Sequence, residues 1–130
     1  MKRRMCLKAM LGVGAALSAA GAANAQTPVV LHVDLSVDPT KEKEMLYNFH
    51  TIFKPAATKQ PGYIDVKMCK LRSTLQGTAP TGLNYRFQLT YQSEELRQRW
   101  VASETHQKVW PTIEGTLKSK EFTVLLFDLA

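Results

Sequence analysis

The chain has 130 residues, which is enough for one domain and too short for two. Its 17 basic and 11 acidic residues give a formal net charge of +6. Four of the basic residues lie in an N-terminal stretch without acidic residues, so residues 26–130 hold 13 basic and 11 acidic residues, a net charge of +2. So small an excess, with no cluster of Lys and Arg interleaved with aromatics, argues against nucleic acid as a partner.

Residues 1–25 have the pattern of an export signal peptide. A basic head precedes a mildly apolar run over residues 7–23, and Ala23-Asn24-Ala25 matches an A-x-A cleavage site. A membrane anchor is the alternative, but the run is rich in Gly and Ala and falls short of the ~20 strongly apolar residues of a span. We therefore expect cleavage, a mature domain of residues 26–130 without a membrane anchor, and a periplasmic or secreted location.

The basic head indicates the export route. Arg3-Arg4 followed by Met5-Cys6-Leu7-Lys8 resembles the twin-arginine export pattern, and the weakly apolar run that follows suits that route. An ordinary secretory signal with two adjacent arginines is the alternative. The pattern predicts twin-arginine export.

Cys69 is the only cysteine of the predicted mature domain. A single cysteine excludes an intramolecular disulfide and a Cys-rich structural zinc site. In an oxidising compartment such a thiol is either buried or reactive. Its place in a predicted strand favours a small buried hydrophobic residue.

The first half of the mature domain predicts a strand, a helix and a second strand. Apolar and polar residues alternate over residues 29–37, as in a half-buried strand. Asp38 and Pro39 then form an N-cap and a first helical residue, and Pro55 should disturb the last turns of that helix. The expected apolar face of the helix consists of Leu46, Phe49, Ile52, Phe53 and Ala56. After the turn Gln60-Pro61-Gly62, a strand over residues 63–72 should place Ile64, Val66 and Met68 on one face and Asp65, Lys67 and Cys69 on the other.

The second half predicts a strand, a broken helix and a last strand. Over residues 83–92, Tyr85, Phe87, Leu89 and Tyr91 alternate with polar residues. Ser93 is a good N-cap, and the helix should break at Ala102-Ser103 before a second segment. The buried residues of that segment should be His106, Val109, Trp110, Ile113 and Leu117. Residues 121–129 form a strand that is apolar on both faces.

This order predicts an α+β fold, the ferredoxin-like β-α-β-β-α-β arrangement with an antiparallel sheet and helices on one face. The other face would carry polar residues and the apolar last strand, which would aggregate if left in water. A second copy packed sheet to sheet covers it, so we expect a two-fold homodimer, a dimeric α/β barrel. A monomer whose polar sheet face is solvated is the alternative. The polar residues of that face are His32, Asp34, Lys67, Arg86 and Gln88.

Several features resemble the antibiotic biosynthesis monooxygenase family. They are the element order, the turn Gln60-Pro61-Gly62-Tyr63, the tyrosine-rich third strand, and the run from Ser93 to Ser103-Glu104-Thr105-His106. The resemblance covers roughly residues 29–129. It implies a dimeric α/β barrel with an aromatic pocket between sheet and helices. It also implies either a cofactor-independent oxygenase acting on an aromatic or quinol-type molecule, a haem-degrading enzyme, or a protein without a reaction.

The resemblance also implies which residues line the pocket. Trp100 and His106 correspond to its lid, and Trp110, Tyr85 and Phe87 are further candidates for substrate binding. The haem-degrading branch has an Asn on the first strand and a Trp and a His on the lid helix. Here that strand has no Asn, and ten residues after Trp100 stands Trp110 instead of His. The residues therefore depart from the haem-degrading pattern.

The candidate catalytic residues are His106, His32, Asp34 and Arg86. His106 could act as a general base, or it could be a half-buried helix residue bonded to a backbone carbonyl. His32 and Asp34 point to one side of a strand and, with Arg86, could form an acid-base group or a polar dimer interface. The tryptophans could form a wall for a flat ligand or belong to the core.

No phosphate-binding Gly loop, metal-ligand cluster or Ser-His-Asp arrangement can be read in the chain, so we expect neither cofactor nor metal. The expected function is an exported, cofactor-independent, monooxygenase-like homodimer. The alternative is a protein of the same fold that binds a small hydrophobic ligand, or haem, without turnover.

Overall fold

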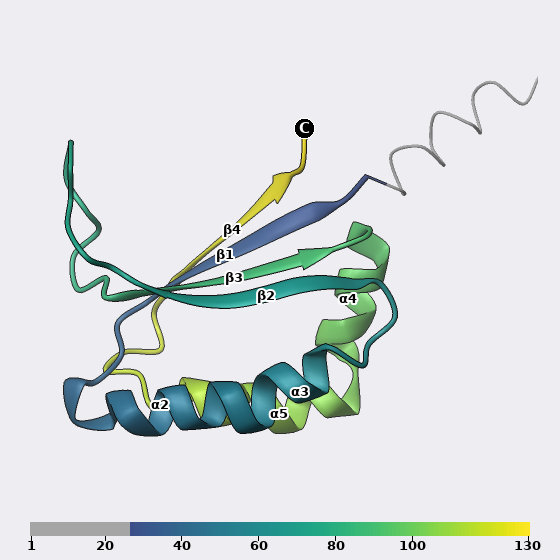
Figure 1. The fold of residues 1–130 in the computed structure, drawn as a ribbon, viewed down its shortest axis with the longest axis horizontal. Coiled ribbons are helices and arrows are strands. Elements are labelled where there is room, and N and C mark those ends of the chain that lie inside the picture. The colour runs from purple at the N-terminus through teal and green to yellow at the C-terminus, as the bar shows by residue number, and fades with distance from the viewer. Residues whose placement is uncertain (1–26) are drawn as a thin grey trace, which may run out of the picture.

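The computed structural model describes residues 27–130. In chain order the strands and main helices are β1 (Val29–Leu35), α2 (Glu42–Asn48), α3 (Lys54–Ala57), β2 (Tyr63–Lys70), β3 (Tyr85–Tyr91), α4 (Glu94–Ala102), α5 (Glu104–Glu114) and β4 (Thr123–Asp128). The strands form one antiparallel sheet in the order β2-β3-β1-β4. All helices lie on one side of it, and no helix of residues 27–130 covers the opposite side, which we call the bare face (Figure 1). The predicted β-α-β-β-α-β arrangement is confirmed.

The two central strands supply most of the core. β1 is buried at Val29, Leu31, Val33 and Leu35, and the residues between them are half-buried. β3 is buried in the same alternation, at the four positions that the sequence predicts: Tyr85, Phe87, Leu89 and Tyr91. Because paired residues of neighbouring strands share a face, these side chains form one apolar layer under the sheet.

The first helical stretch begins as predicted. The Asp38 carboxylate accepts a hydrogen bond from the Thr40 backbone N–H at 2.9 Å, and Pro39 occupies the first helical position of a 3₁₀ turn, Pro39–Lys41. This cap satisfies an N–H group that has no partner within the helix. The turn leads directly into α2.

A π-helical turn, Phe49–Phe53, separates α2 from α3 and changes which residues are buried. The Lys54 N–H donates to the Phe49 carbonyl, five residues back. The turn ends two residues before Pro55. Pro55 has no N–H to donate to a carbonyl of the preceding turn, so the regular hydrogen-bond pattern cannot continue through it. Because the wider turn shifts the helix phase, Met45, Phe49, Phe53 and Ala57 are buried at a spacing of four residues. The prediction that Ile52 is buried is therefore wrong, since its side chain is 38% exposed.

The predicted break between the last two helices is confirmed at Ser103. Ser93 caps α4 by accepting from the Leu96 N–H, and Ser103 caps α5 by accepting from the His106 N–H, each at 3.2 Å. Ser103 has extended backbone angles, so α4 and α5 are separate rods. They enclose an angle in which Trp100 and His106 come together, with ring centroids 5.1 Å apart.

Two predictions for residues of β2 are wrong, the first because of a β-bulge. The register shifts between Tyr63 and Asp65, so Ile64 is an inserted residue and is 46% exposed instead of buried beside Val66. Cys69 lies on the bare face of this edge strand and is exposed, so the predicted burial of its thiol is wrong.

β4 is the opposite edge strand, and all its residues are exposed. Val124 and Leu126 share the helix-side face with Val33 and Leu31, but the helices leave them 50% and 45% exposed. Leu125 and Phe127 lie on the bare face and are 42% and 48% exposed. Within residues 27–130 the sheet is therefore open. The chain by itself does not form the closed barrel that the expected assembly would have.

The predicted export signal, residues 1–25, lies outside the described residues. Among residues 27–130, no helix is long and apolar enough to cross a membrane.

Candidate functional site

A cavity of about 200 Å³ lies between the sheet and the two last helices. Its floor comes from β1 and β3, and its walls come from α4, α5 and the start of β4. Most of its lining is apolar, and Arg97 and His106 are its two polar side chains. The lining residues are Leu31, Val33, Phe53, Phe87, Leu89, Arg97, Trp100, Val101, His106, Trp110, Phe122 and Val124.

Aromatic rings form the inner wall of this cavity. The Trp100 and His106 rings meet edge to face at 5.1 Å, and the His106 and Trp110 rings are nearly parallel at 6.2 Å and 13°. Phe53 contacts both indoles edge to face, at 5.9 and 6.1 Å. Such contacts fix ring orientations, so the wall is preorganised. Trp100 is only 3% exposed, so it belongs to the core and also lines the cavity.

His106 presents a neutral imidazole to this apolar space. Burial, and secondarily the positive charge of Arg97, lower the pKa of His106 below its ordinary value of 6.5. Within the described part of the chain, neither ring nitrogen makes a hydrogen bond, and the backbone N–H of His106 donates to Ser103 Oγ. The ring is thus held by aromatic contacts alone. A neutral ring nitrogen remains available to accept a hydrogen bond or a proton from a ligand.

Arg97 is a cavity residue that the sequence analysis did not select. Its side chain is 17% exposed, and its Nε and Nη2 donate to the two carboxylate oxygens of Glu94 at 2.6 and 2.7 Å. This ion pair raises the pKa of Arg97. The i, i+3 spacing of Glu94 and Arg97 on one helix was the available signal, but it is also common on solvated surfaces.

The structure does not bring the other polar candidates to this cavity. His32, Asp34 and Arg86 lie on the bare face of the sheet, because they alternate with the buried residues of β1 and β3. Arg86 pairs directly with Asp34 across the strands, donating from Nε and Nη2 at 2.6 and 3.1 Å. His32 contacts Phe127 on the same face, with ring centroids 5.1 Å apart. The Asp34 carboxylate is engaged in an ion pair, an arrangement that suits a polar interface.

Of the two aromatic candidates on β3, only one lies in the cavity. Phe87 lines the cavity, with its ring 5.9 Å from that of Trp110. Tyr85 lies at the other end of the sheet, where its hydroxyl donates to Glu42 Oε2 at 2.5 Å. Burial and this hydrogen bond raise the pKa of Tyr85 to about 12. Of the predicted site residues, the cavity therefore contains Phe87, Trp100, His106 and Trp110.

Comparison with known proteins supports the assignment of the fold. No protein-family model and no curated protein matches the chain. Solved structures do match, among them a "putative antibiotic biosynthesis monooxygenase" from Caulobacter crescentus, with a TM-score of 0.64 and 14% identity over 86% of this chain and 98% of that one. A protein from Bordetella bronchiseptica with the same description has a TM-score of 0.64 and 10% identity, over 81% of this chain and 99% of that one. A "dimeric ferredoxin-like protein of unknown function" from Jannaschia has a TM-score of 0.63 and 16% identity over 79% and 98%.

The chain has the ferredoxin-like fold of these proteins. The expected resemblance to antibiotic biosynthesis monooxygenases is thereby confirmed at the level of the fold. The likeness spans nearly the full length of each neighbour. A fold hosts many functions, so the activity has to be argued from the cavity itself.

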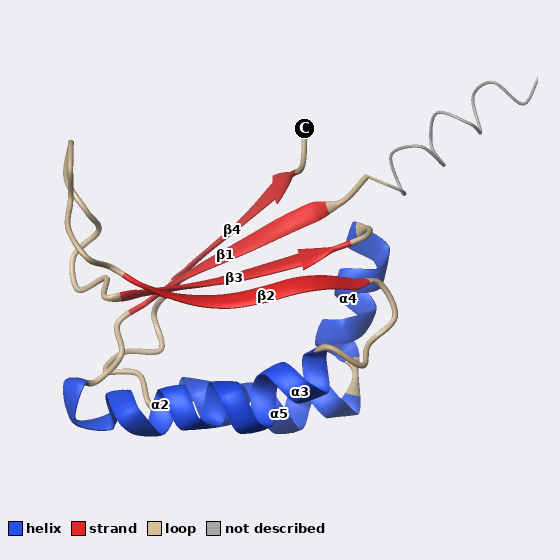
Figure 2. Ribbon diagram, in the orientation of Figure 1, coloured by secondary structure: helices blue, strands red, loops and turns tan. Residues whose placement is uncertain are grey.

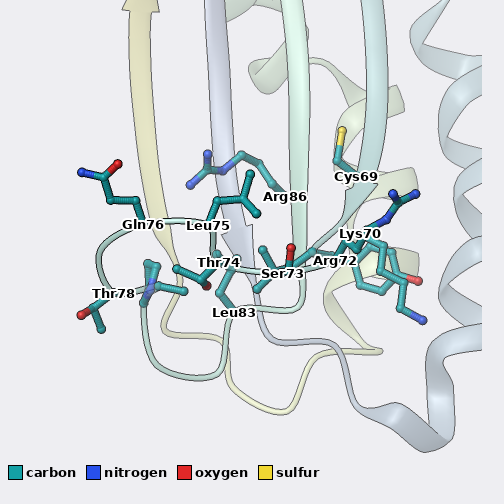
Figure 3. A pocket seen from close by; sticks show the side chains of 14 residues that line it. Cys69, Lys70, Arg72, Ser73, Thr74, Leu75, Gln76, Thr78, Leu83 and Arg86 are labelled. Carbon is teal, nitrogen blue, oxygen red and sulfur yellow. The ribbon is translucent and has the colours of Figure 1, made fainter.

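This ferredoxin-like chain has a second, larger hollow of about 600 Å³ beneath the β2–β3 loop. The loop rises from the sheet on the side away from the helices (Figure 2). Side chains of Cys69, Leu75 and Arg86 lie around the hollow (Figure 3). It is open. Of its three charged residues, Lys70 and Arg86 are paired with Glu42 and Asp34, and Arg72 makes no ion pair within residues 27–130. Among residues 27–130, no group of three or more His, Cys, Asp and Glu side chains could hold a metal ion.

Proposed function

We propose that this protein is an exported, cofactor-independent, monooxygenase-like homodimer that acts on an aromatic or quinol-type small molecule. The observation that carries this proposal is the His106 imidazole. It lines an apolar, aromatic cavity, and among the described residues its ring nitrogens have no hydrogen-bond partner. A neutral imidazole in such a place is suited to removing a proton from a phenolic hydroxyl.

The proposed reaction uses the bound substrate as the reductant. His106 accepts the hydroxyl proton, and the resulting anion donates electrons to dioxygen in a cavity that excludes most water. One oxygen atom becomes bonded to a substrate carbon, and the other leaves as water with two hydrogens of the substrate. For a simple phenol the products are a quinone and one water, so dioxygen is the only co-reactant required. Trp100, Trp110 and Phe87 hold the ring against the proton acceptor.

Oxygen uptake tests this function. The mature protein is mixed with anthrones and hydroquinones in an oxygen electrode, alongside His106→Ala and Trp100→Ala. We expect uptake by the wild type with at least one of these substrates, and we expect both variants to lose most of it. The matched control is His50→Ala, which removes an exposed imidazole from the first helical stretch and should retain the wild-type rate. Equal uptake by the His106 variant would remove the proposed base from the mechanism.

The homodimer is proposed from the bare sheet face. Leu125 and Phe127 are exposed there beside His32, and an edge strand with exposed apolar residues readily pairs with another chain. The Jannaschia protein of the same fold is described as dimeric. Light scattering after size exclusion should give twice the mass of the mature chain. Leu125→Lys with Phe127→Lys should give a monomer, whereas the control Tyr47→Lys, at a 66% exposed residue of α2 on the helix side, should remain dimeric.

Export is proposed from residues 1–25 alone. Replacing Arg3 and Arg4 by Lys should leave the precursor in the cytoplasm if the route is twin-arginine, while an ordinary secretory signal would tolerate the change. Cell fractionation and N-terminal sequencing of the mature protein report the route and the cleavage site. We expect the mature chain to begin at Gln26.

The second candidate function is ligand binding without turnover. It is favoured by the largely apolar lining of the cavity, which would suit a carrier or sensor as well as an enzyme. Co-purifying ligand in mass spectra, without oxygen uptake for any substrate, would identify this function. Haem is the alternative ligand, and a titration followed at the Soret band tests whether it binds. The cavity of about 200 Å³ lies below the ~300–1,000 Å³ of sites for drug-sized ligands, so we expect no stoichiometric haem binding.

A further inference from the structure

We propose that the cavity selects a phenol with a single ring and binds it as the phenolate, with Arg97 as the residue that holds the anionic oxygen. This inference rests on the ligand site proposed above, although it does not require turnover. It narrows the substrate class from aromatic molecules in general to single-ring phenols. It also assigns a role to the one charged side chain in the cavity lining.

The size of the cavity sets the limit on the ring system. Its volume is about 200 Å³. An apolar cavity of about 150 Å³ is large enough for benzene, whereas sites for drug-sized ligands begin near ~300 Å³. The space therefore encloses one substituted ring, whereas three fused rings would extend out of its open side. Its inner wall cannot easily retreat, because Phe53 packs edge to face against both Trp100 and Trp110.

Arg97 has the donors to bind an anion. A guanidinium carries five N–H groups, and Glu94 accepts from only two of them. No other acceptor contacts this guanidinium within residues 27–130, so three N–H groups remain for a ligand. Because the Glu94 pair is bidentate, it also fixes the plane of the guanidinium. Glu94 offsets part of the charge of Arg97, so the free N–H groups provide most of the attraction, and hydrogen bonds to an anion are stronger beside an apolar cavity than in water.

His106 complements Arg97 within the same cavity. The charge of Arg97 contributes to the lowered pKa of His106, so the positive potential extends to the imidazole. A phenolate would offset that potential, which favours loss of the hydroxyl proton on binding. The neutral ring nitrogen of His106 accepts this proton or a hydrogen bond from a second hydroxyl. The cavity thus combines an anion site, a proton acceptor and a slot for one ring.

Both tryptophans of the chain line the cavity, so quenching of their fluorescence measures binding directly. The probe is 4-nitrophenol, whose phenolate absorbs in the visible, at a pH below the pKa of the free phenol. We expect saturable quenching together with a rise in phenolate absorbance. A three-ring phenol should bind with an affinity at least tenfold lower. 4-Nitrotoluene, which has no hydroxyl to ionise, should bind through apolar contacts alone. Equal affinity for the three-ring phenol, or tighter binding of benzoate than of nitrophenol, would overturn the inference.

Variants on α4 test Arg97. Arg97→Gln should weaken nitrophenol binding roughly 10- to 100-fold, as expected for loss of a charge-assisted hydrogen bond, and should leave nitrotoluene binding unchanged. The matched control Arg99→Gln removes a 70% exposed guanidinium from the same helix and should change neither the nitrophenol affinity nor the nitrotoluene affinity. Unchanged nitrophenol affinity in Arg97→Gln contradicts the assignment. Two measurements on the wild type test the inference without any variant. They are the affinities for one-ring and three-ring phenols and the rise in phenolate absorbance on binding.

The outcomes separate this inference from the proposed reaction. Arg97-dependent phenolate binding without oxygen uptake would reject the oxygenase and retain the phenolate site. Oxygen uptake with a three-ring substrate, and no binding of single-ring phenols, would retain the oxygenase and reject the phenolate site.

Discussion

The imidazole of His106 lies nearly parallel to the indole of Trp110, with the ring planes 13° apart and the centroids separated by 6.2 Å. The two residues are four apart on α5, so one helix face presents a proton acceptor and a flat apolar surface to the same cavity. Arg97, on α4, supplies the charge that this face lacks. The functional proposals depend on this arrangement.

The buried imidazole of His106 should make stability depend on pH. Burial, and then Arg97, lower its pKa in the folded state below 6.5, so the unfolded chain binds a proton at a higher pH than the folded chain does. The contribution to stability is therefore complete above 6.5 and is lost as the pH falls through this value toward the lowered pKa. Urea unfolding from pH 6.5 downwards, at pH values that stay above the ordinary Glu pKa of 4.5, measures it. His106→Phe should flatten the dependence, and the control His50→Gln should not.

Tyr91→Phe should leave the protein as stable as the wild type or stabilise it by about 1 kcal/mol. The Tyr91 hydroxyl is buried and has no hydrogen-bond partner among residues 27–130, and burial, followed by the charge of Tyr63, raises its pKa. Removing an unpaired buried hydroxyl removes a desolvation penalty at little cost in packing. Chemical denaturation compares the two proteins. A loss above 1 kcal/mol would mean that the hydroxyl has a partner in solution, such as a bound water.

Gly62→Ala should destabilise the fold more than Gly77→Ala. Both glycines have positive φ, 87° and 79°, so both substitutions carry backbone strain of about 1–2 kcal/mol. A Cβ at Gly62 would also lie 2.6 Å from Leu96 Cδ1 and 2.8 Å from Leu96 Cβ, whereas a Cβ at Gly77 would meet nothing within 4 Å. The clash should add about 1–3 kcal/mol, measured as a difference in urea midpoints. Equal midpoints would mean that α4 can move away from the turn.

Breaking the ion pair on the bare face should cost stability, with little effect on the cavity. Arg86→Met leaves the Asp34 carboxylate, whose side chain is 10% exposed, without its partner, and should destabilise by about 1–3 kcal/mol. Adding Asp34→Asn to this variant should recover part of the loss, since the unpaired charge is gone. A double-mutant cycle by chemical denaturation, which also includes the single variant Asp34→Asn, gives the coupling energy of the pair. Nitrophenol binding should remain at the wild-type level in all three variants; a matching loss of binding would give this pair a role in the site.

The strands and helix ends were predictable because they depend on local chemistry. The Asp38, Ser93 and Ser103 caps each use a side chain within three residues of the N–H group they satisfy. The alternation of β3 identified its buried face without knowledge of its neighbours. Ile52 and Ile64 were placed wrongly because a π-helical turn and a β-bulge each shift the phase of a regular pattern.

The sequence alone thus determined the order of the elements, the two layers of the fold and the breaks between helices, because residues close in the chain set them. Only the tertiary structure decided which candidates share a cavity. Arg86 and Phe87 are neighbours in the chain, yet successive strand residues point to opposite faces, so one lies on the bare face and the other in the cavity. Arg97 joins His106 because the break at Ser103 turns α4 back over the sheet, and that angle depends on packing between distant segments.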